Sequence, residues 1–107
     1  MPRLQQGSVV WAQLPAPAGR RPVLVLTRDS AVRRLNGITV APITRTIRNI
    51  DTEVVLEPVD GVPTTCAVTL DNIFTIERAA FSTAIVVVSR DRLLQVFAAI
   101  RRAFDMP

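Results

Sequence analysis

Three amino acids are missing from the 107-residue sequence: histidine, lysine and tyrosine. Without histidine, the chain has no imidazole for acid–base catalysis and none of the common metal sites built on that side chain. Cysteine occurs once, as Cys66, which excludes an internal disulfide and leaves too few thiolates for a metal cluster. No phosphate-binding GxxxxGK[ST], no GxGxxG and no GxSxG motif is present. We therefore expect no metal and no cofactor, and we expect Cys66 to be a buried strand residue.

Long hydrophobic runs are also missing. The longest apolar segments fall far short of the roughly 20 residues that a membrane-spanning helix needs, and the opening residues MPRLQQGS contain no apolar region of a signal peptide. Because 49% of the residues are hydrophobic, the chain can still bury a core. We expect one domain over residues 1–107, in a soluble cytoplasmic protein that does not bind membranes.

Because lysine is absent, every positive side chain is an arginine, and the arginines are unevenly distributed. Residues 20–48 hold seven arginines against one acid, a net charge of +6, whereas residues 49–107 hold five against eight, a net charge of −3. Such asymmetry favours one basic surface for an anionic partner. The alternatives are a solvated basic face without a ligand and, for the missing lysine, the base composition of the genome. Arginine nevertheless provides a planar fork that suits phosphate.

Short apolar segments bounded by turn residues predict a mainly β fold. Strands are expected at 8–14, 22–28, 38–44, 52–58, 66–70, 73–77 and 83–89. Residues 29–35 predict one or two helical turns with Asp29 or Ser30 as the N-cap, and apolar residues at helical spacing predict a longer helix over 90–104, capped by Ser89. One long helix cannot supply the crossovers of a parallel sheet. We therefore expect a small antiparallel barrel, closed or half-closed, with a C-terminal helix.

Several of these strands are apolar on both faces, Val23 to Leu26 being the clearest example. An antiparallel sheet with one solvated face alternates apolar and polar residues instead. Something therefore covers the second face: the terminal helix, a second subunit, or both.

Three segments carry a resemblance to a known family: GSVVWAQL at 7–14, GRRPVLVL at 19–26 and APITRTIR at 41–48. Together with CAVTLDNIFTI at 66–76 and the terminal amphipathic helix, they resemble the MazF family of toxin endoribonucleases, in its order and spacing. The resemblance implies an SH3-like barrel, a homodimer, and metal-independent cleavage of single-stranded RNA to 2′,3′-cyclic phosphate and 5′-hydroxyl ends, which arrests growth. It also implies a partner antitoxin whose flexible segment covers the RNA groove.

The family's catalytic arginine, in its Arg-Pro dipeptide, corresponds to Arg21, and its catalytic threonine, in Pro-Ile-Thr, corresponds to Thr44. The residues themselves suggest the same pair. If the strands at 22–28 and 38–44 are neighbours, Arg21 can clamp a phosphate while Thr44 donates a hydrogen bond to it. The candidate RNA-binding residues are Arg20, Arg45, Thr46, Arg48, Asp71 and Asn72.

Some assignments remain open at this point. Trp11 either stacks on a base or, more commonly for an aromatic residue in an apolar strand, packs in the core. Asp71 and Asn72 either read base edges or form an Asx turn. The loop PAPAGR at 15–20 lacks the glutamate that many family members carry, so Glu53 and Asp71 are candidate substitutes for a general base.

Two other functions compete with RNA cleavage. One is a noncatalytic inhibitor on the same barrel, like the CcdB gyrase poisons, which would need neither Arg21 nor Thr44. The other is an RNA-binding barrel without turnover, which would keep the basic surface alone. Cleavage by the RNA's own 2′-hydroxyl needs no metal and no protein nucleophile, so the missing histidine and cysteine constellations do not argue against a nuclease.

Overall fold

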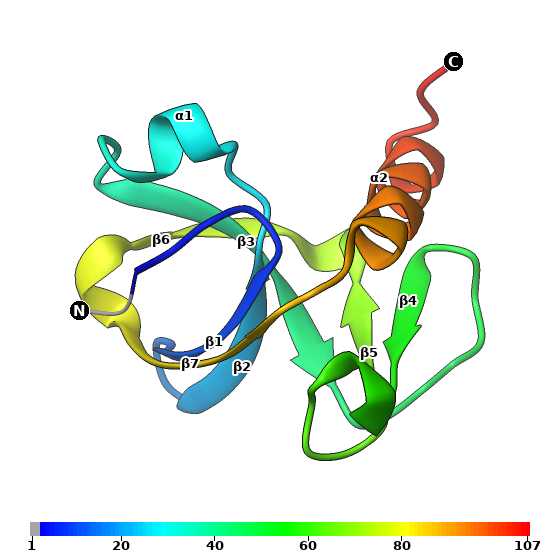
Figure 1. The fold of residues 1–107 in the computed structure, drawn as a ribbon, viewed down its shortest axis with the longest axis horizontal. Helices are drawn as coiled ribbons and strands as arrows, with labels where there is room; N and C mark the ends of the chain where they lie inside the picture. Colours follow the sequence, from blue (N-terminus) through cyan, green and yellow to red (C-terminus); the bar gives the residue numbers. More distant parts are fainter. Residues whose placement is uncertain (1–2) are drawn as a thin grey trace.

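The computed structural model describes residues 3–107, which form seven strands and two α-helices (Figure 1). These elements are β1 (Ser8–Gln13), β2 (Arg20–Val25), α1 (Asp29–Val32), β3 (Gly37–Thr44), β4 (Glu53–Leu56), β5 (Cys66–Thr69), β6 (Phe74–Glu77), β7 (Phe81–Val87) and α2 (Arg90–Ala103). Three 3₁₀ turns connect them: η1 (Pro58–Asp60), η2 (Leu70–Asn72) and η3 (Arg78–Ala80). Each expected strand is present, but β2 begins two residues earlier than predicted, at Arg20, and β7 begins at Phe81.

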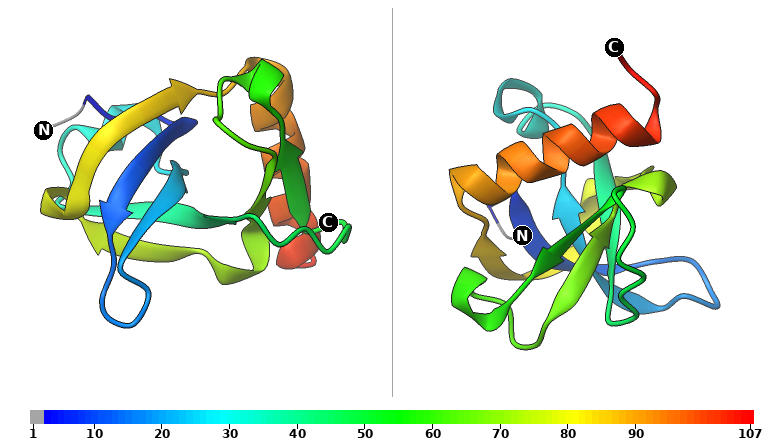
Figure 2. Two further views of the ribbon diagram at one scale, coloured as in Figure 1. Left: turned by 90° about the horizontal axis from the view of Figure 1, so that it is seen from below. Right: turned by 90° about the vertical axis from the view of Figure 1, so that its right-hand side faces the viewer.

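The strands form one antiparallel sheet in the order β4-β5-β3-β2-β1-β7, and β6 also pairs with β3. Strand β3 is the centre of this arrangement. Its first half pairs with β6, whereas Ile43 and Thr44 near its end pair with β5. The sheet therefore curls into a half-barrel with α2 lying along one side (Figure 2). This confirms the expected mainly β fold, an antiparallel barrel with a C-terminal helix.

Alternation along β1, β2 and β3 sends successive side chains into two separate cores. Val9, Leu24 and Ala41 belong to a first core that includes Val96 and Ala99 of α2. The residues next to them in sequence point the other way, so that Val10, Val23 and Val40 belong to a second core. Both faces of these strands are therefore apolar within one chain. One face lines the interior of the barrel, and α2 and the β4–β5 ribbon cover the other face.

The two helix starts differ from each other. Ser89 caps α2 as predicted, since its hydroxyl accepts a hydrogen bond from the backbone N–H of Arg92 at 3.2 Å. The prediction of Asp29 or Ser30 as the cap of α1 is wrong. Arg28 occupies that position without a side-chain bond, and the Asp29 carboxylate instead accepts a hydrogen bond from the backbone N–H of Gln6 at 2.7 Å. Asp29 thereby fastens the N-terminal segment to the barrel.

No helix in residues 3–107 has both the length and the hydropathy that crossing a bilayer requires.

Candidate functional site

A groove of about 810 Å³ opens at the end of the barrel where β2 begins and β3 ends. Four segments build it: the β1–β2 hairpin, which projects from the barrel in Figure 2, the end of β3 with the residues after it, the chain before β5, and one residue of β7. The lining residues are Val9, Trp11, Leu14, Ala18, Arg20, Arg21, Pro22, Pro42, Ile43, Thr44, Arg45, Thr46, Val62, Pro63, Thr64, Cys66 and Ile85.

Arg21 and Thr44 both line this groove. Strands β2 and β3 are neighbours, as the candidate site required, with Val23 opposite Pro42 and Leu24 opposite Ala41. Continuing this register by two residues places Arg21 across from Thr44. Both residues then stand on the same side of the sheet, since side chains alternate with a period of two. The sheet topology thus brings together two residues that are 23 positions apart in the sequence.

Both side chains keep hydrogen-bond donors available for a ligand. The Nε–H of Arg21 donates to the carbonyl oxygen of Ala18 at 2.9 Å, which anchors the guanidinium to the hairpin loop. Its two terminal NH₂ groups make no hydrogen bond to the described residues. The Thr44 hydroxyl accepts from the backbone N–H of Thr46 at 3.1 Å, which leaves its own hydrogen to donate. Such a pair of oriented donors suits a phosphate group.

Of the other candidate binding residues, three lie in the groove and three do not. Arg20, Arg45 and Thr46 line it. Arg48 is outside the lining and bonds to Glu53, with a nitrogen–oxygen distance of 3.3 Å. Asp71 and Asn72 lie in η2, where Asp71 accepts a hydrogen bond from the Thr52 hydroxyl. The roles of these residues remain predictions.

No carboxylate is present among the described residues that line the groove. Glu53, a candidate base, has a side chain only 2% exposed and is held by Arg48, and the structure does not place Asp71 beside Arg21 and Thr44 either. The described lining therefore lacks the carboxylate oxygens by which proteins usually hold magnesium. Its charge comes from three arginines, so that it attracts anions.

Cys66 is 6% exposed at the base of the groove, as expected of a buried strand residue. Burial, followed by the nearby negative charge of Asp60, raises the pKa of this thiol above its ordinary value. The side chain therefore stays a neutral thiol at physiological pH and is not an activated nucleophile.

The segment before β5 forms a wall of the groove, and α2 holds it in place. The Arg92 guanidinium on α2 donates to Asp60 at 3.1 Å, while the other oxygen of that carboxylate accepts from the backbone N–H of Glu57 at 2.8 Å. These two hydrogen bonds lower the pKa of Asp60, and the charge of Arg92 acts in the same direction. Residues 62–64 of the wall follow directly after this anchor.

Two features of the groove were not foreseen from the sequence. One is the wall at 62–64, whose only signals in the sequence were the turn residues around Pro63. The other is the position of Trp11, for which the core was the commoner expectation. The indole is instead half-buried and lines the groove, with the guanidinium carbon of Arg20 at 4.3 Å from the ring centroid.

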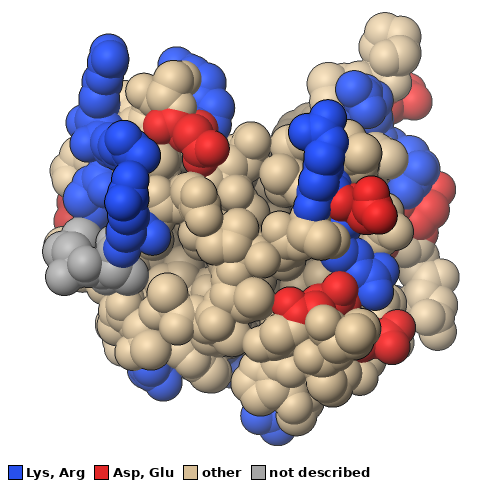
Figure 3. Space-filling model, viewed as in Figure 1, with Lys and Arg blue, Asp and Glu red and all other residues tan. Residues whose placement is uncertain are grey.

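The arginines of residues 20–48 do not form the single basic surface that their clustering suggested. Arg20 and Arg21 lie at the start of β2, whereas Arg28 lies beyond its end, next to α1. In Figure 3 positive side chains gather on the flank that carries α1 and, mixed with acidic ones, on the flank that carries α2. The basic character is therefore divided between the groove and the opposite end of the barrel.

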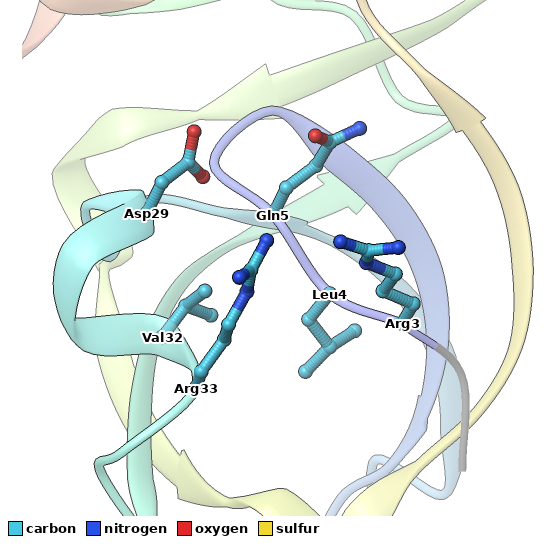
Figure 4. A pocket seen from close by; sticks show the side chains of 6 residues that line it. All are labelled: Arg3, Leu4, Gln5, Asp29, Val32 and Arg33. Atoms are coloured by element: carbon cyan, nitrogen blue, oxygen red, sulfur yellow. The ribbon is translucent and has the colours of Figure 1, made fainter.

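A smaller cavity of about 280 Å³ lies at that opposite end, between the N-terminal segment and α1. Figure 4 shows Arg3, Leu4 and Gln5 of the N-terminal segment around it, together with Asp29, Val32 and Arg33. Because Asp29 contributes a negative charge here and is already bound to Gln6, this cavity is less selective for anions than the groove.

Comparisons with known proteins agree with this description. Residues 5–104 match the family described as PemK-like, MazF-like toxin of type II toxin–antitoxin system. The probable endoribonuclease MazF5 of Mycobacterium tuberculosis is 51% identical over 69 residues, which are 64% of this chain and 62% of that protein. The alignment thus spans less than two thirds of that relative. The probable endoribonuclease MazF2 of the same species is 45% identical over 78 residues, 72% of this chain and 76% of that protein.

Solved structures show the same fold. The Mycobacterium tuberculosis toxin MazF-mt6 superposes with a TM-score of 0.86 at 35% identity, over 94% of this chain and 98% of the other. A mycobacterial endoribonuclease in complex with its cognate antitoxin superposes with a TM-score of 0.87 at 23% identity, over 98% of both chains; at that identity the likeness concerns the fold alone.

Proposed function

This chain belongs to the family of PemK-like and MazF-like toxins of type II toxin–antitoxin systems, and from that premise we propose that it is an endoribonuclease that cleaves single-stranded RNA in the groove. The relatives that carry the name endoribonuclease support this proposal. The observation that carries it is that Arg21 and Thr44 both line one groove, each with donors that no described residue uses.

In the proposed reaction, the scissile phosphate lies between these two residues. The terminal NH₂ groups of Arg21 bind its nonbridging oxygens as a fork, and the Thr44 hydroxyl donates to one of them. The 2′-oxygen of the preceding ribose attacks phosphorus in line with the leaving 5′-oxygen. Holding these atoms in line supplies several kcal/mol of the barrier. The donors bind the extra charge of the phosphorane, an effect worth about 10²–10³ in rate for one such donor.

The products follow from this geometry. A bond forms between the 2′-oxygen and phosphorus while the bond to the 5′-oxygen breaks, so the ends are a 2′,3′-cyclic phosphate and a 5′-hydroxyl. The guanidinium group is a hydrogen-bond donor with no acceptor site, so Arg21 cannot act as the base. Because the described lining offers no carboxylate or imidazole, we assign the 2′-hydroxyl proton to solvent water, which also returns a proton to the leaving 5′-oxygen, and the stabilisation of charge to Arg21.

Partners follow from family membership. We propose that a cognate antitoxin restrains this toxin by laying a flexible segment in the groove, that the toxin works as a homodimer, and that its target is messenger RNA in the cytoplasm, whose cleavage arrests growth. A segment that neutralises three arginines would compete with RNA for the same surface. A noncatalytic gyrase inhibitor would need neither Arg21 nor Thr44, and an RNA-binding barrel without turnover would need only a basic surface.

The direct test incubates the purified chain with a long single-stranded RNA of mixed sequence in EDTA, maps the cut sites and analyses the ends. We expect cuts at a short recurring sequence, with cyclic phosphate and 5′-hydroxyl ends. An RNA carrying a single 2′-deoxynucleotide on the 5′ side of the mapped bond is the matched control, and that bond should remain intact. Intact RNA across several diverse substrates would contradict the proposal, and so would cleavage of the deoxy-substituted bond.

A further inference from the structure

Trp11 and Arg20 form a stacked pair inside the groove, apart from the proposed phosphate site. The guanidinium carbon of Arg20 is 4.3 Å from the centroid of the indole ring. The pairing of β1 with β2 explains this contact: Gln13 lies opposite Arg20 and Trp11 lies opposite Pro22, so Trp11 and Arg20 are diagonal neighbours. Diagonal neighbours on one face of a sheet are within reach of long and aromatic side chains.

This stacking fixes the orientation of an otherwise flexible arginine. One face of the guanidinium is covered by the indole, and the rest of the Arg20 side chain is exposed to solvent. Val9, Pro22 and Ile85 line the groove as well, so the surroundings of Trp11 are largely apolar. Apolar walls beside a flat cation suit a heterocyclic ring better than a phosphate.

Arg20 and Arg21 therefore perform different tasks although they are adjacent. Successive residues of a strand point to opposite faces, so Arg20 shares its face with Trp11 whereas Arg21 shares its face with Thr44. Unpaired bases in RNA complexes stack on aromatic rings and on arginine planes. Both pairs nevertheless line the same groove, so a strand bound there can set a phosphate against Arg21 and a base against Trp11 and Arg20.

We propose that Trp11 and Arg20 form a stacking platform for an unpaired nucleobase next to the scissile phosphate, an inference that rests on the proposed function of the groove. Every base has a π-face, so the platform supplies affinity for single strands without selecting one base. Base selection is then left to other residues of the groove.

The test uses the fluorescence of Trp11, which is the only tryptophan in a chain without tyrosine. The probes are 2′-O-methyl oligoadenylate and oligouridylate 12-mers, which cannot be cleaved, and an abasic 12-mer with the same phosphate spacing. Binding of each dye-labelled probe is measured separately by anisotropy. We expect both base-carrying probes to quench the emission of Trp11, and the abasic strand to bind by charge without quenching it.

Two substitutions separate stacking from charge. Arg20→Lys keeps the charge but removes the planar face, and Trp11→Leu removes the ring; Trp11→Phe keeps an aromatic surface. We expect Trp11→Leu to weaken binding of the oligoadenylate about tenfold or more, with a smaller loss for Trp11→Phe and no change for the abasic strand. Circular dichroism checks that each variant folds, and Arg33→Lys at the other end of the barrel is the control.

The platform would be overturned if the abasic strand quenched Trp11 as strongly as the base-carrying probes, or if oligoadenylate bound without quenching. It would also be overturned if neither base-carrying probe bound, or if Arg20→Lys weakened the binding of base-carrying and abasic strands equally. Quenching by an acidic antitoxin peptide alone would assign the pair to protein recognition instead. Cleavage of RNA by the wild-type chain without quenching would reject the platform and leave the nuclease proposal standing. Quenching without cleavage would reject the nuclease proposal alone.

Discussion

The anchor between α2 and the groove wall gives a stability prediction that the structure makes quantitative. In Asp60→Asn, one carbonyl oxygen replaces two carboxylate oxygens that accept from Arg92 and Glu57. One of the two hydrogen bonds and the charge are therefore lost. Hydrogen bonds to charged groups contribute about 1.5–3 kcal/mol, whereas exposed ion pairs contribute up to about 1 kcal/mol.

The side chains of Arg92 and Asp60 are 23% and 11% exposed, which places the pair nearer to the first range. We expect a loss of about 2 kcal/mol in the free energy of unfolding. With an unfolding entropy of about 2.1 cal/mol/K per residue over 107 residues, each 1 kcal/mol lowers Tm by about 4–5 °C. The expected fall in Tm is therefore about 9 °C, measured by calorimetry at pH 7.

A second ion pair formed by an arginine of α2 provides a matched control. Asp51 pairs with Arg102 at 3.8 Å, and their side chains are 75% and 48% exposed. The same change in Asp51→Asn should cost less than about 1 kcal/mol, because Arg102 also donates to the backbone oxygen of Asp51, which the substitution leaves in place.

The pH dependence of Asp60→Asn has a defined sign. In the folded chain the pKa of Asp60 lies below its ordinary value of 3.8, mainly because of the hydrogen bond from Arg92. The carboxylate therefore stabilises the fold above that ordinary value, and this contribution is lost as the pH falls through the folded pKa. The gap in Tm between wild type and Asp60→Asn should narrow in that acid range. Two results would refute the reasoning. One is an equal fall in Tm for Asp60→Asn and Asp51→Asn at pH 7, and the other is a difference in Tm between wild type and Asp60→Asn that persists in acid.

Three further predictions concern single features. Ser89→Ala should cost about 1 kcal/mol by calorimetry because the N-cap of α2 is lost, and Ser89→Asp should restore it; an unchanged Tm would contradict the cap. The thiol of Cys66, buried and with a raised pKa, should react with Ellman's reagent at pH 8 only after unfolding in guanidinium, whereas a fast native reaction would mean an open thiol. For a 2′-O-methyl RNA, the slope of log binding constant against log salt should be about −1.4 if Arg21 and Arg45 contact phosphates while Arg20 stacks on a base. Arg45→Gln should reduce its magnitude by about 0.7, and an unchanged slope would remove Arg45 from the interface.

Local sequence patterns predicted which segments form helices and strands, and strand pairing determined where the strands begin and end. The apolar segments of β1 and β3 and the helical spacing of α2 indicate their structures because the same residues form the cores. The start of β2 was missed, since Arg20 and Arg21 join the strand by backbone pairing with Gln13 and Ala12, which their side chains do not signal.

The site was predictable only where residues lie close in sequence or match a motif. Arg21 and Thr44 were predicted from Arg-Pro and Pro-Ile-Thr; both line the groove, and their catalytic role stays a prediction. The pairing of Asp60 with Arg92 spans 32 positions and has no local signature. Trp11 stayed open between core and groove because alternation shows which face a residue occupies, but whether that face ends in a core or in a groove depends on where the sheet curls.

The most direct test of the account is the single-turnover rate of RNA cleavage at a mapped site by wild type, Arg21→Ala and Thr44→Ala, with Arg33→Ala as the control from the opposite end of the barrel. Each groove substitution removes one oriented donor, so we expect the rate to fall by about 10²–10³. Circular dichroism and Tm should stay unchanged, because neither side chain contributes to the cores. Arg33→Ala should cleave like wild type. Groove variants that retain the wild-type rate, or an Arg33→Ala variant that loses it, would contradict the assignment of the catalytic site to the groove.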